Sequence, residues 1–304
     1  MSKLKAEARP LREPLARGAK TGATVVVEPL LGGEMRCPPG GLENPGGRLK
    51  VARELGIGTP RSKWPWIPAP AFLITHPTAG PVLVDTAFHG SVATKPAANL
   101  GRVMARLSHA RIETGRDLPT QLRERGIDAR ELETVVMTHL HFDHSSGISE
   151  YPHATFVLAQ REWDAAANDD RPLLRGYNHA HFDYLFDYRT IDFDRPGISS
   201  YASFGRTFDL FGDGSIRIAF TPGHTPGHCS VIARLRDRDF VIAGDAIYTY
   251  AQLEGGDPPP RPVDVHNWQR SLRELQQFAR TYPQAEIVAG HDRAQWSALE
   301  KRYE

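Results

Sequence analysis

Four residues able to bind a metal ion lie within six consecutive positions, in the segment His139-Leu140-His141-Phe142-Asp143-His144. Imidazole nitrogen and carboxylate oxygen are ligands that Zn, Fe, Mn and Co accept at about 2.0 to 2.2 Å. His139 and His141 are predicted to point one way toward one ion, while Asp143 and His144 serve a neighbouring ion. The segment therefore predicts a site for two divalent metal ions.

Two ions need more than four protein ligands, and the ends of other apolar segments supply candidates. His224 follows the apolar segment at 216–220, Asp245 follows 240–243, and His291 follows 286–289. A carboxylate between two cations is a natural bridge, so Asp245 is assigned that role. Spacing alone does not choose between His224 and His228 in the repeated segment "TPGHTPGH".

The elements that must position these residues are short strands separated by helices. Alternation and β-branching predict strands at 71–75, 82–85, 134–138, 155–158, 216–220, 230–233, 240–243 and 286–289, and apolar spacing predicts helices near 49–55, 100–107, 118–125 and 267–281. Asp85 ends one of the strands, as His139 does. Metal-binding residue types at several strand ends indicate a site built along the rim of a sheet.

The chain is expected to fold as a single α/β domain over residues 21–304, preceded by a polar N-terminal arm at 1–20. Residues 31–67 are rich in Gly and Pro, which favours turns over regular structure. Long loops in compact domains are often functional. We therefore predict a loop-rich lid over 31–67.

Composition narrows the function classes. The formal net charge is +1 and charges of both signs are spread along the chain, which argues against binding to nucleic acid or to an anionic membrane. Without a run of about 18 apolar residues or a secretory leader, a cytoplasmic protein is expected. The chain has 2 Cys, Cys37 and Cys229, too few for a thiolate-rich zinc site. Both cysteines are interpreted as taking no part in function.

The residues resemble the metallo-β-lactamase superfamily, whose motif H-x-H-x-D-H is followed by a distant His, Asp and His. The resemblance runs from about residue 71 to 292 and implies an αββα sandwich of two mixed sheets with a dinuclear metal site at the sheet rim. The implied ligands are His139, His141, Asp143, His144, His224, Asp245 and His291. The ions are expected to be Zn²⁺, with Fe, Mn or Co as alternatives.

The segments "TPGHTPGH", "GDAIY" and "AGHD" are similar to those of the N-acyl homoserine lactonase branch. That resemblance selects His224 over His228, places Tyr248 near the scissile carbonyl, and gives Asp85 the role of orienting the His-rich loop. It implies a quorum-quenching metallo-hydrolase of carboxylic esters. A hydroxide shared by the ions would open a small lactone ring, with Asp143 carrying the proton to the leaving alkoxide.

Other hypotheses stay open at the level of sequence. A different small lactone such as a pyridine-type lactone, or a glyoxalase II-like thioester, would suit the same ligands, and so would a metal-dependent binding or sensor protein. Trp64, Trp66, Phe88 and Met104 are candidates to bind an acyl chain or to pack in the core. His179 and His181, in "HAHFD", are interpreted as part of a surface helix or lip. The basic N-terminal arm and the aromatic loops are candidate surfaces for a homodimer contact.

Overall fold

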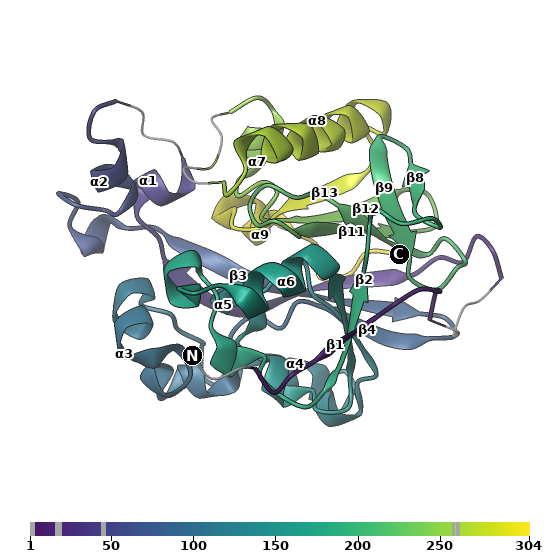
Figure 1. Cartoon of the computed structure of the whole chain (residues 1–304), viewed down its shortest axis with the longest axis horizontal. Coiled ribbons are helices and arrows are strands. Elements are labelled where there is room, and N and C mark those ends of the chain that lie inside the picture. The colour runs from purple at the N-terminus through teal and green to yellow at the C-terminus, as the bar shows by residue number, and fades with distance from the viewer. Residues whose placement is uncertain (1–3, 16–19, 44–46, 257–258, 260–261) are drawn as a thin grey trace.

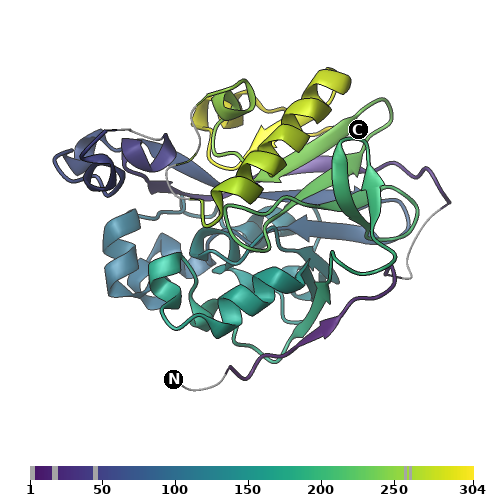
Figure 2. The same cartoon turned by 45° about the horizontal axis from the view of Figure 1, so that its top comes forward.

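The computed structural model describes residues 4–15, 20–43, 47–256, 259 and 262–304. Within these residues the strands form two sheets, with helices on the outer side of each sheet (Figure 1). The turned view in Figure 2 shows the helices α3 to α6 below one sheet and the long helix α8 above the other. Two mixed sheets between two helical layers confirm the αββα sandwich expected from the sequence.

The first sheet is seven-stranded and comes mainly from the first half of the chain. Its order is β1 (Ala8–Pro10), β7 (Asp187–Ile191), β6 (Thr155–Ala159), β5 (Thr134–Val136), β4 (Gly80–Val84), β3 (Trp66–His76) and β2 (Val26–Arg36). The pairs from β1 to β4 are parallel, whereas β4, β3 and β2 are antiparallel.

The second sheet is six-stranded and comes from the second half. Its order is β13 (Glu286–Ala289), β12 (Asp239–Gly244), β11 (Cys229–Arg234), β10 (Ile216–Phe220), β9 (Phe204–Asp209) and β8 (Ser199–Tyr201). Only the pair of β12 and β13 is parallel among these strands.

The α-helices of the described residues are α1 (Pro39–Leu42), α2 (Lys50–Glu54), α3 (Pro96–Ser108), α4 (Leu118–Arg123), α5 (Phe142–Ser145), α6 (Gln160–Asn168), α7 (Tyr250–Leu253), α8 (Val265–Thr281) and α9 (Arg293–Ala298). Short 3₁₀ turns lie at η1 (Arg61–Lys63), η2 (Gly90–Ala93), η3 (Ala129–Glu131), η4 (Ile148–Glu150), η5 (Pro172–Arg175) and η6 (His179–His181). None of the described helices has the length and apolar character needed to cross a lipid bilayer.

Alternation along the strands builds the apolar layers. Ile216 and Ile218 of β10 face the space between the two sheets, whereas Ala219 faces the helical layer with α8. In β4, Val82 and Val84 face the space between the sheets, whereas Leu83 packs toward the helices below. Because side chains alternate with a period of two, each sheet can bury both of its faces.

The expected lid over 31–67 is wrong at both of its ends, since residues 31–36 belong to β2 and 66–67 belong to β3. Gly32 and Gly33 obscured β2: the register shifts there, and Gly33 has a φ of +140°. Pro68 and Pro70 obscured β3, and they lie in the part of β3 that extends past its pairing with β4. Proline is tolerated at such positions because no partner needs its missing N–H.

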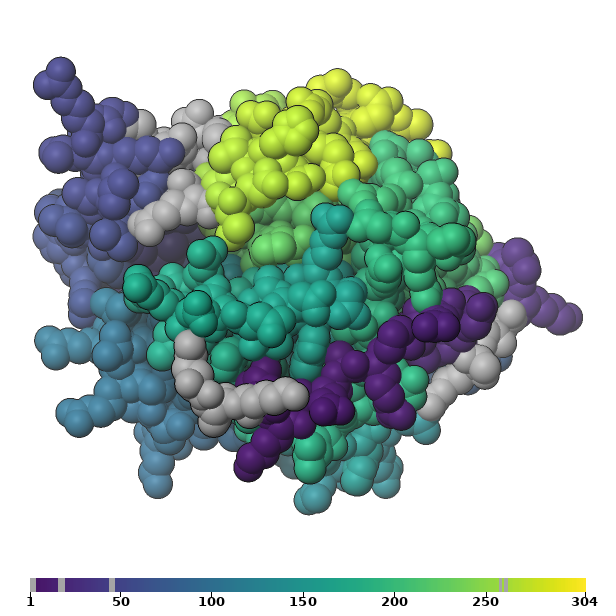
Figure 3. Space-filling model, in the orientation of Figure 1, coloured from purple at the N-terminus to yellow at the C-terminus, as the bar shows by residue number. Residues whose placement is uncertain are grey.

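The N-terminal arm follows the surface of the molecule, seen in purple in Figure 3. It is tied to the first sheet, because Ala8–Pro10 pairs with β7 and the carboxylate of Asp183 accepts hydrogen bonds from the Lys5 and Ala6 N–H groups. Its three-residue strand is too short to show a period in the sequence.

Candidate metal centre

Five strands bring polar residues to one edge of the sandwich. In the first sheet β4 and β5 are parallel, and Asp85 and His139 follow their ends. In the second sheet β10, β12 and β13 run in one direction, and His224, Asp245 and His291 follow their ends. The ends of these strands from the two sheets meet there, as expected for a site along a sheet rim.

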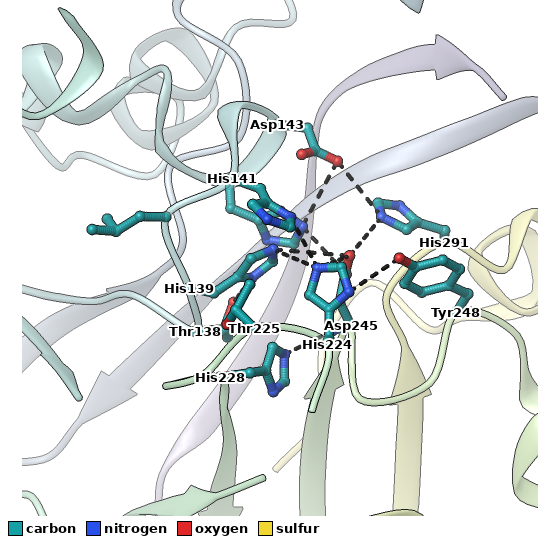
Figure 4. Close-up of polar contacts among 12 residues, drawn as sticks. Thr138, His139, His141, Asp143, His224, Thr225, His228, Asp245, Tyr248 and His291 are labelled. Carbon is teal, nitrogen blue, oxygen red and sulfur yellow. Dashed lines mark hydrogen bonds and ion pairs between the residues drawn. The ribbon is translucent and has the colours of Figure 1, made fainter. Parts of the chain in front are cut away.

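One cluster holds three histidines, His139, His141 and His224. Nε2 of His224 lies 3.2 Å from Nε2 of His139 and 2.9 Å from Nδ1 of His141. The three rings converge from two loops, one after β5 and one after β10 (Figure 4). Their nitrogen atoms lie within 4.8 Å of one another, which is close enough for a single metal ion.

A second cluster holds Asp143, His144 and His291. Oδ2 of Asp143 lies 3.6 Å from Nε2 of His291 and 3.9 Å from Nε2 of His144. The loop 139–144 therefore contributes His139 and His141 to the first cluster, and Asp143 and His144 to the second. This is the division expected from the sequence.

The carboxylate of Asp245 lies between the two clusters. Its Oδ2 is 3.3 Å from Nε2 of His224 and 3.2 Å from Nε2 of His291, while its Oδ1 is 3.3 Å from Nε2 of His144. One carboxylate thus reaches nitrogen atoms of both clusters, as a bridging ligand requires.

Burial and neighbouring charges set the protonation states in the absence of an ion. Burial lowers the pKa of His141 to about 4 and holds the pKa values of His139 and His224 well below the ordinary value, so these rings are neutral. Burial alone would raise the pKa of Asp245, but His291 and His144 lower it well below its usual range. Burial would lower the pKa values of His144 and His291, but nearby carboxylates, above all Asp85 for His144 and Asp245 for His291, raise them, so a metal ion would bind these two rings by displacing a proton.

Two buried atoms at the centre test whether an ion fits. Nε2 of His144 and Oδ1 of Asp245 are inaccessible to solvent and lie 3.3 Å apart, but neither makes a hydrogen bond with any described residue. Buried polar atoms are normally satisfied, and such exceptions call for an explanation. The donor set of imidazole nitrogen and carboxylate oxygen suits a divalent first-row metal. The residues therefore fit the metal site expected from the sequence.

Asp85 lies beneath the His-rich loop, as the sequence predicted. Its Oδ1 accepts the Thr138 N–H at 2.7 Å, and its Oδ2 accepts the Thr138 hydroxyl at 2.7 Å and the His144 Nδ1–H at 2.8 Å. The Thr138 hydroxyl oxygen in turn lies 3.1 Å from Nδ1 of His139. Both histidines are thereby held with Nε2 directed at the clusters.

His228 is fully buried beside the site but does not belong to either cluster. Its Nε2 accepts the backbone N–H of Asp245 at 2.9 Å, and its Nδ1 lies 3.1 Å from the carbonyl oxygen of Thr221. The ring fixes the backbone that carries Asp245. The structure thus separates the two histidines of "TPGHTPGH" in favour of His224.

Tyr248 lies at the same cavity as the clusters, and its hydroxyl is 3.1 Å from Nδ1 of His224. The cavity has a volume of about 370 Å³. Besides the site residues, its wall includes the apolar side chains Met35, Leu42, Ile67, Phe142, Leu174 and Val263. An apolar wall beside a polar centre suits a small uncharged ligand.

None of the four residues considered for acyl-chain binding lines this cavity. The guanidinium groups of Arg36 and Arg111 lie 4.7 and 3.6 Å from the centroid of the Trp66 ring, and Phe88 is fully buried in the core. Cys37 contributes to the wall of the cavity, a placement that the sequence did not predict. Burial, with Asp143 and Asp245 nearby, raises the pKa of the Cys37 thiol to about 12.

The second His-rich segment is not part of the site. His179 and His181 form a 3₁₀ turn, and neither joins a metal-binding cluster among the described residues. Nε2 of His181 lies 3.1 Å from the carbonyl oxygen of Asn99, and this ring is buried. The segment packs against the first half of the chain, so it is less exposed than the surface helix we expected.

Residues that hold the loops were not found from the sequence. Glu162, on α6, is fully buried and accepts hydrogen bonds from both loops that carry the clustered histidines. Its sequence context, "AQREWDAA", has the pattern of an ordinary amphipathic helix. Gly176 was not predicted either. It has a φ of +88°, and a Cβ there would lie 2.7 Å from the His141 ring. Neither residue type signals a metal site by itself.

The fold and the site define a metal-dependent hydrolase. The family model of the metallo-β-lactamase superfamily matches residues 64–291, and the chain belongs to this superfamily.

Relatives and solved structures agree with this assignment. N-acyl homoserine lactonase AttM of Agrobacterium fabrum is 31% identical over 239 residues, which cover 77% of this chain and 86% of that protein. N-acyl homoserine lactonase AiiB of the same organism is 26% identical over 198 residues, covering 61% of this chain and 66% of AiiB. A solved N-acyl homoserine lactone hydrolase with N-hexanoyl-L-homoserine at its catalytic metal centre superposes with a TM-score of 0.72 at 18% identity, covering 91% of this chain and 97% of that one. The dizinc lactonase AidC has a TM-score of 0.54 at 14% identity, covering 92% and 91%.

Proposed function

We propose that this enzyme opens the ester ring of N-acyl homoserine lactones and so acts in quorum quenching. The observation that carries the proposal is the meeting of three features in one cavity: two His/Asp clusters sharing Asp245, the phenol of Tyr248, and an apolar wall. The relatives AttM and AiiB are both N-acyl homoserine lactonases, which supports this choice among ester substrates.

We propose two bound Zn²⁺ ions, one held by His139, His141 and His224 and the other by Asp143, His144 and His291, with Asp245 bridging them. Such ions supply a water of lowered pKa and polarise the ester carbonyl. The dizinc state of AidC supports zinc. Nitrogen and oxygen ligands also accept Fe, Mn and Co, so metal analysis of the purified protein tests the choice.

The chain's own groups then act on the substrate. The hydroxyl of Tyr248 can accept a hydrogen bond from Nδ1 of His224, 3.1 Å away, and donate its own hydrogen to the carbonyl oxygen. A donor aimed at the developing oxyanion stabilises the transition state. Asp143, nearly buried at the cavity, would take up the proton released from the attacking water and pass it to the alkoxide that leaves within the opened ring.

The wall of the cavity would hold the acyl chain. Met35, Leu42 and Ile67 come from the end of β2, from α1 and from the start of β3, whereas Leu174 and Val263 come from later loops. These side chains carry no charge, and burial of an acyl chain against them favours substrates with a hydrocarbon tail. We place the enzyme in the cytoplasm, where its two free cysteines would stay reduced.

The experiment is a substrate panel with zinc-reconstituted enzyme and acid release as the readout. N-acyl homoserine lactones of several chain lengths are compared with a pyridine-type lactone, a glutathione thioester and a phosphodiester. We expect the acyl homoserine lactones to give the highest kcat/KM. Turnover of the thioester or phosphodiester with no lactone hydrolysis would refute the proposed substrate class.

A further inference from the structure

Glu162 is a buried carboxylate in the part of the fold that carries the three-histidine cluster. It lies in the first turn of α6, its exposed fraction is 0%, and it forms no ion pair with any described residue. Burial raises its pKa, although several hydrogen bonds act in the opposite direction. A buried acid without a cationic partner is costly unless hydrogen bonds compensate for its burial, so the groups that it contacts show what it does in the fold.

Each oxygen of this carboxylate serves a different loop. Oε1 accepts the backbone N–H of Leu140 at 2.9 Å, and Leu140 separates His139 from His141. Oε2 accepts the hydroxyl of Thr225 at 2.6 Å and the backbone N–H of Gly227 at 3.2 Å.

Thr225 follows His224 directly in sequence. Glu162 therefore joins the loop of the first sheet to the turn of the second sheet, and between them these two segments carry all three histidines of the cluster.

Close packing leaves little freedom at this junction. A Cβ at Gly227 would lie 2.0 Å from the backbone nitrogen of Glu162 and 2.5 Å from its Cα, so the turn and the helix are in direct backbone contact. The ring of Tyr177 packs against His141, with the two ring centroids 5.1 Å apart. Burial and the nearby carboxylate of Glu162 raise the pKa of Tyr177.

We propose that Glu162 is a positioning residue that sets the separation of the His139/His141 loop and the His224 turn, and thereby the metal affinity of the three-histidine cluster. The inference rests on the proposed metal role of that cluster. It assigns no such role at the second cluster, because none of the hydrogen bonds from Glu162 reaches Asp143, His144 or His291.

The substitution E162Q separates this role from simple packing. Glutamine has nearly the same shape but offers one acceptor and one donor group. Its amide NH₂ would face either the Leu140 N–H or the Gly227 N–H, so one loop loses its acceptor. Outer partners of metal ligands typically change metal affinity by about 10- to 100-fold. We expect that loss at one of the two zinc sites and wild-type affinity at the other.

The measurement is a zinc titration of apo-enzyme against a chromophoric chelator, together with the absorption spectrum of the Co²⁺-loaded protein. T225V removes one hydrogen bond without changing the shape, and it should give a smaller loss in the same site. T225S keeps the hydroxyl and should restore wild-type affinity. T225V also tests the proposal if E162Q does not fold.

The matched control is E150Q, because Glu150 also accepts a backbone N–H, that of Gly90, but has no contact with the clusters. It should leave both zinc affinities unchanged. Wild-type zinc binding and Co²⁺ spectra in both E162Q and T225V, even with a lowered Tm, would overturn the inference and leave the proposed function standing. A wild-type protein that binds no zinc would instead overturn the proposed function.

Discussion

Replacing Asp85 by asparagine should weaken one metal site while leaving the fold intact. Asp85 has a φ of +59°, a conformation that asparagine adopts more readily than most residues, so the backbone is not strained further. The amide oxygen can still accept the Thr138 N–H. The amide nitrogen, however, replaces the oxygen that accepts the His144 Nδ1–H at 2.8 Å, so two donors would face each other.

The magnitude follows from this mismatch. Either a buried donor loses its acceptor, at about 1 to 3 kcal/mol, or the His144 proton moves to Nε2, the atom directed at the second cluster. Loss of such an outer partner typically lowers metal affinity by about 10- to 100-fold, which corresponds to about 1.4 to 2.7 kcal/mol. We expect zinc titration of D85N to show this loss at one site, with kcat falling because the second ion is not retained.

The matched control is D213N. Asp213 and His76 form another buried pair, with Oδ2 and Nε2 2.9 Å apart, beside the opposite end of β3 from the clusters. The same chemical change there should lower the free energy of unfolding without altering zinc binding. Equal zinc affinities in D85N, D213N and wild type would refute the assignment of Asp85 as the group that orients His144.

Three further outcomes are expected. With zinc in excess, so that loss of the Tyr248 hydroxyl beside Nδ1 of His224 does not empty the site, Y248F should lower kcat by about 100- to 1,000-fold with little change in KM, since one donor to the oxyanion is lost. Unchanged lactone hydrolysis would contradict that role. Removing zinc with a chelator should lower Tm, because a ligand present at 100 times its Kd stabilises the folded state by about 2.7 kcal/mol per site. Adding zinc back should restore the Tm. Burial raises the pKa of Glu150 from 4.5 to about 7, so its ionisation opposes folding increasingly as pH rises from 4.5 through 7. E150Q should therefore be more stable than wild type at pH 8, by up to about 3 kcal/mol, with a smaller gain at pH 5. The same substitution at the exposed Glu131, E131Q, serves as the comparison. A gain for E150Q that does not grow with pH would contradict the assignment.

The sequence predicted the elements whose pattern is local. β10 and β13 have the bounds that alternation indicated, and α8 was evident from Trp268, Leu275 and Phe278 on one face. β2 was missed because Gly32 and Gly33 interrupt its pattern. Short strands such as β8 were missed because three residues cannot display a period. Edge and bulged strands depend on pairing partners, which a single sequence does not reveal.

The residues of the site divide in the same way, into those with a local sequence pattern and those that depend on tertiary contacts. His139, His141, Asp143 and His144 were evident because their residue types are rare and lie close together in sequence. Glu162 was not evident, because its function depends on Leu140 and Thr225, which are 22 and 63 residues away. A glutamate in the first turn of a helix is ordinary in sequence, and only the tertiary structure shows that it is buried.

The distribution of the site over the two sheets has a consequence for how the enzyme is made. Residues before position 145 supply only four of the seven clustered side chains, and Asp245, which lies between the clusters, comes about 100 residues after Asp143. A growing chain that has emerged only through the first sheet has no complete cluster of either kind. With the metal ligands proposed above, metal binding would require the second sheet to be complete, because neither cluster is complete in the first sheet alone.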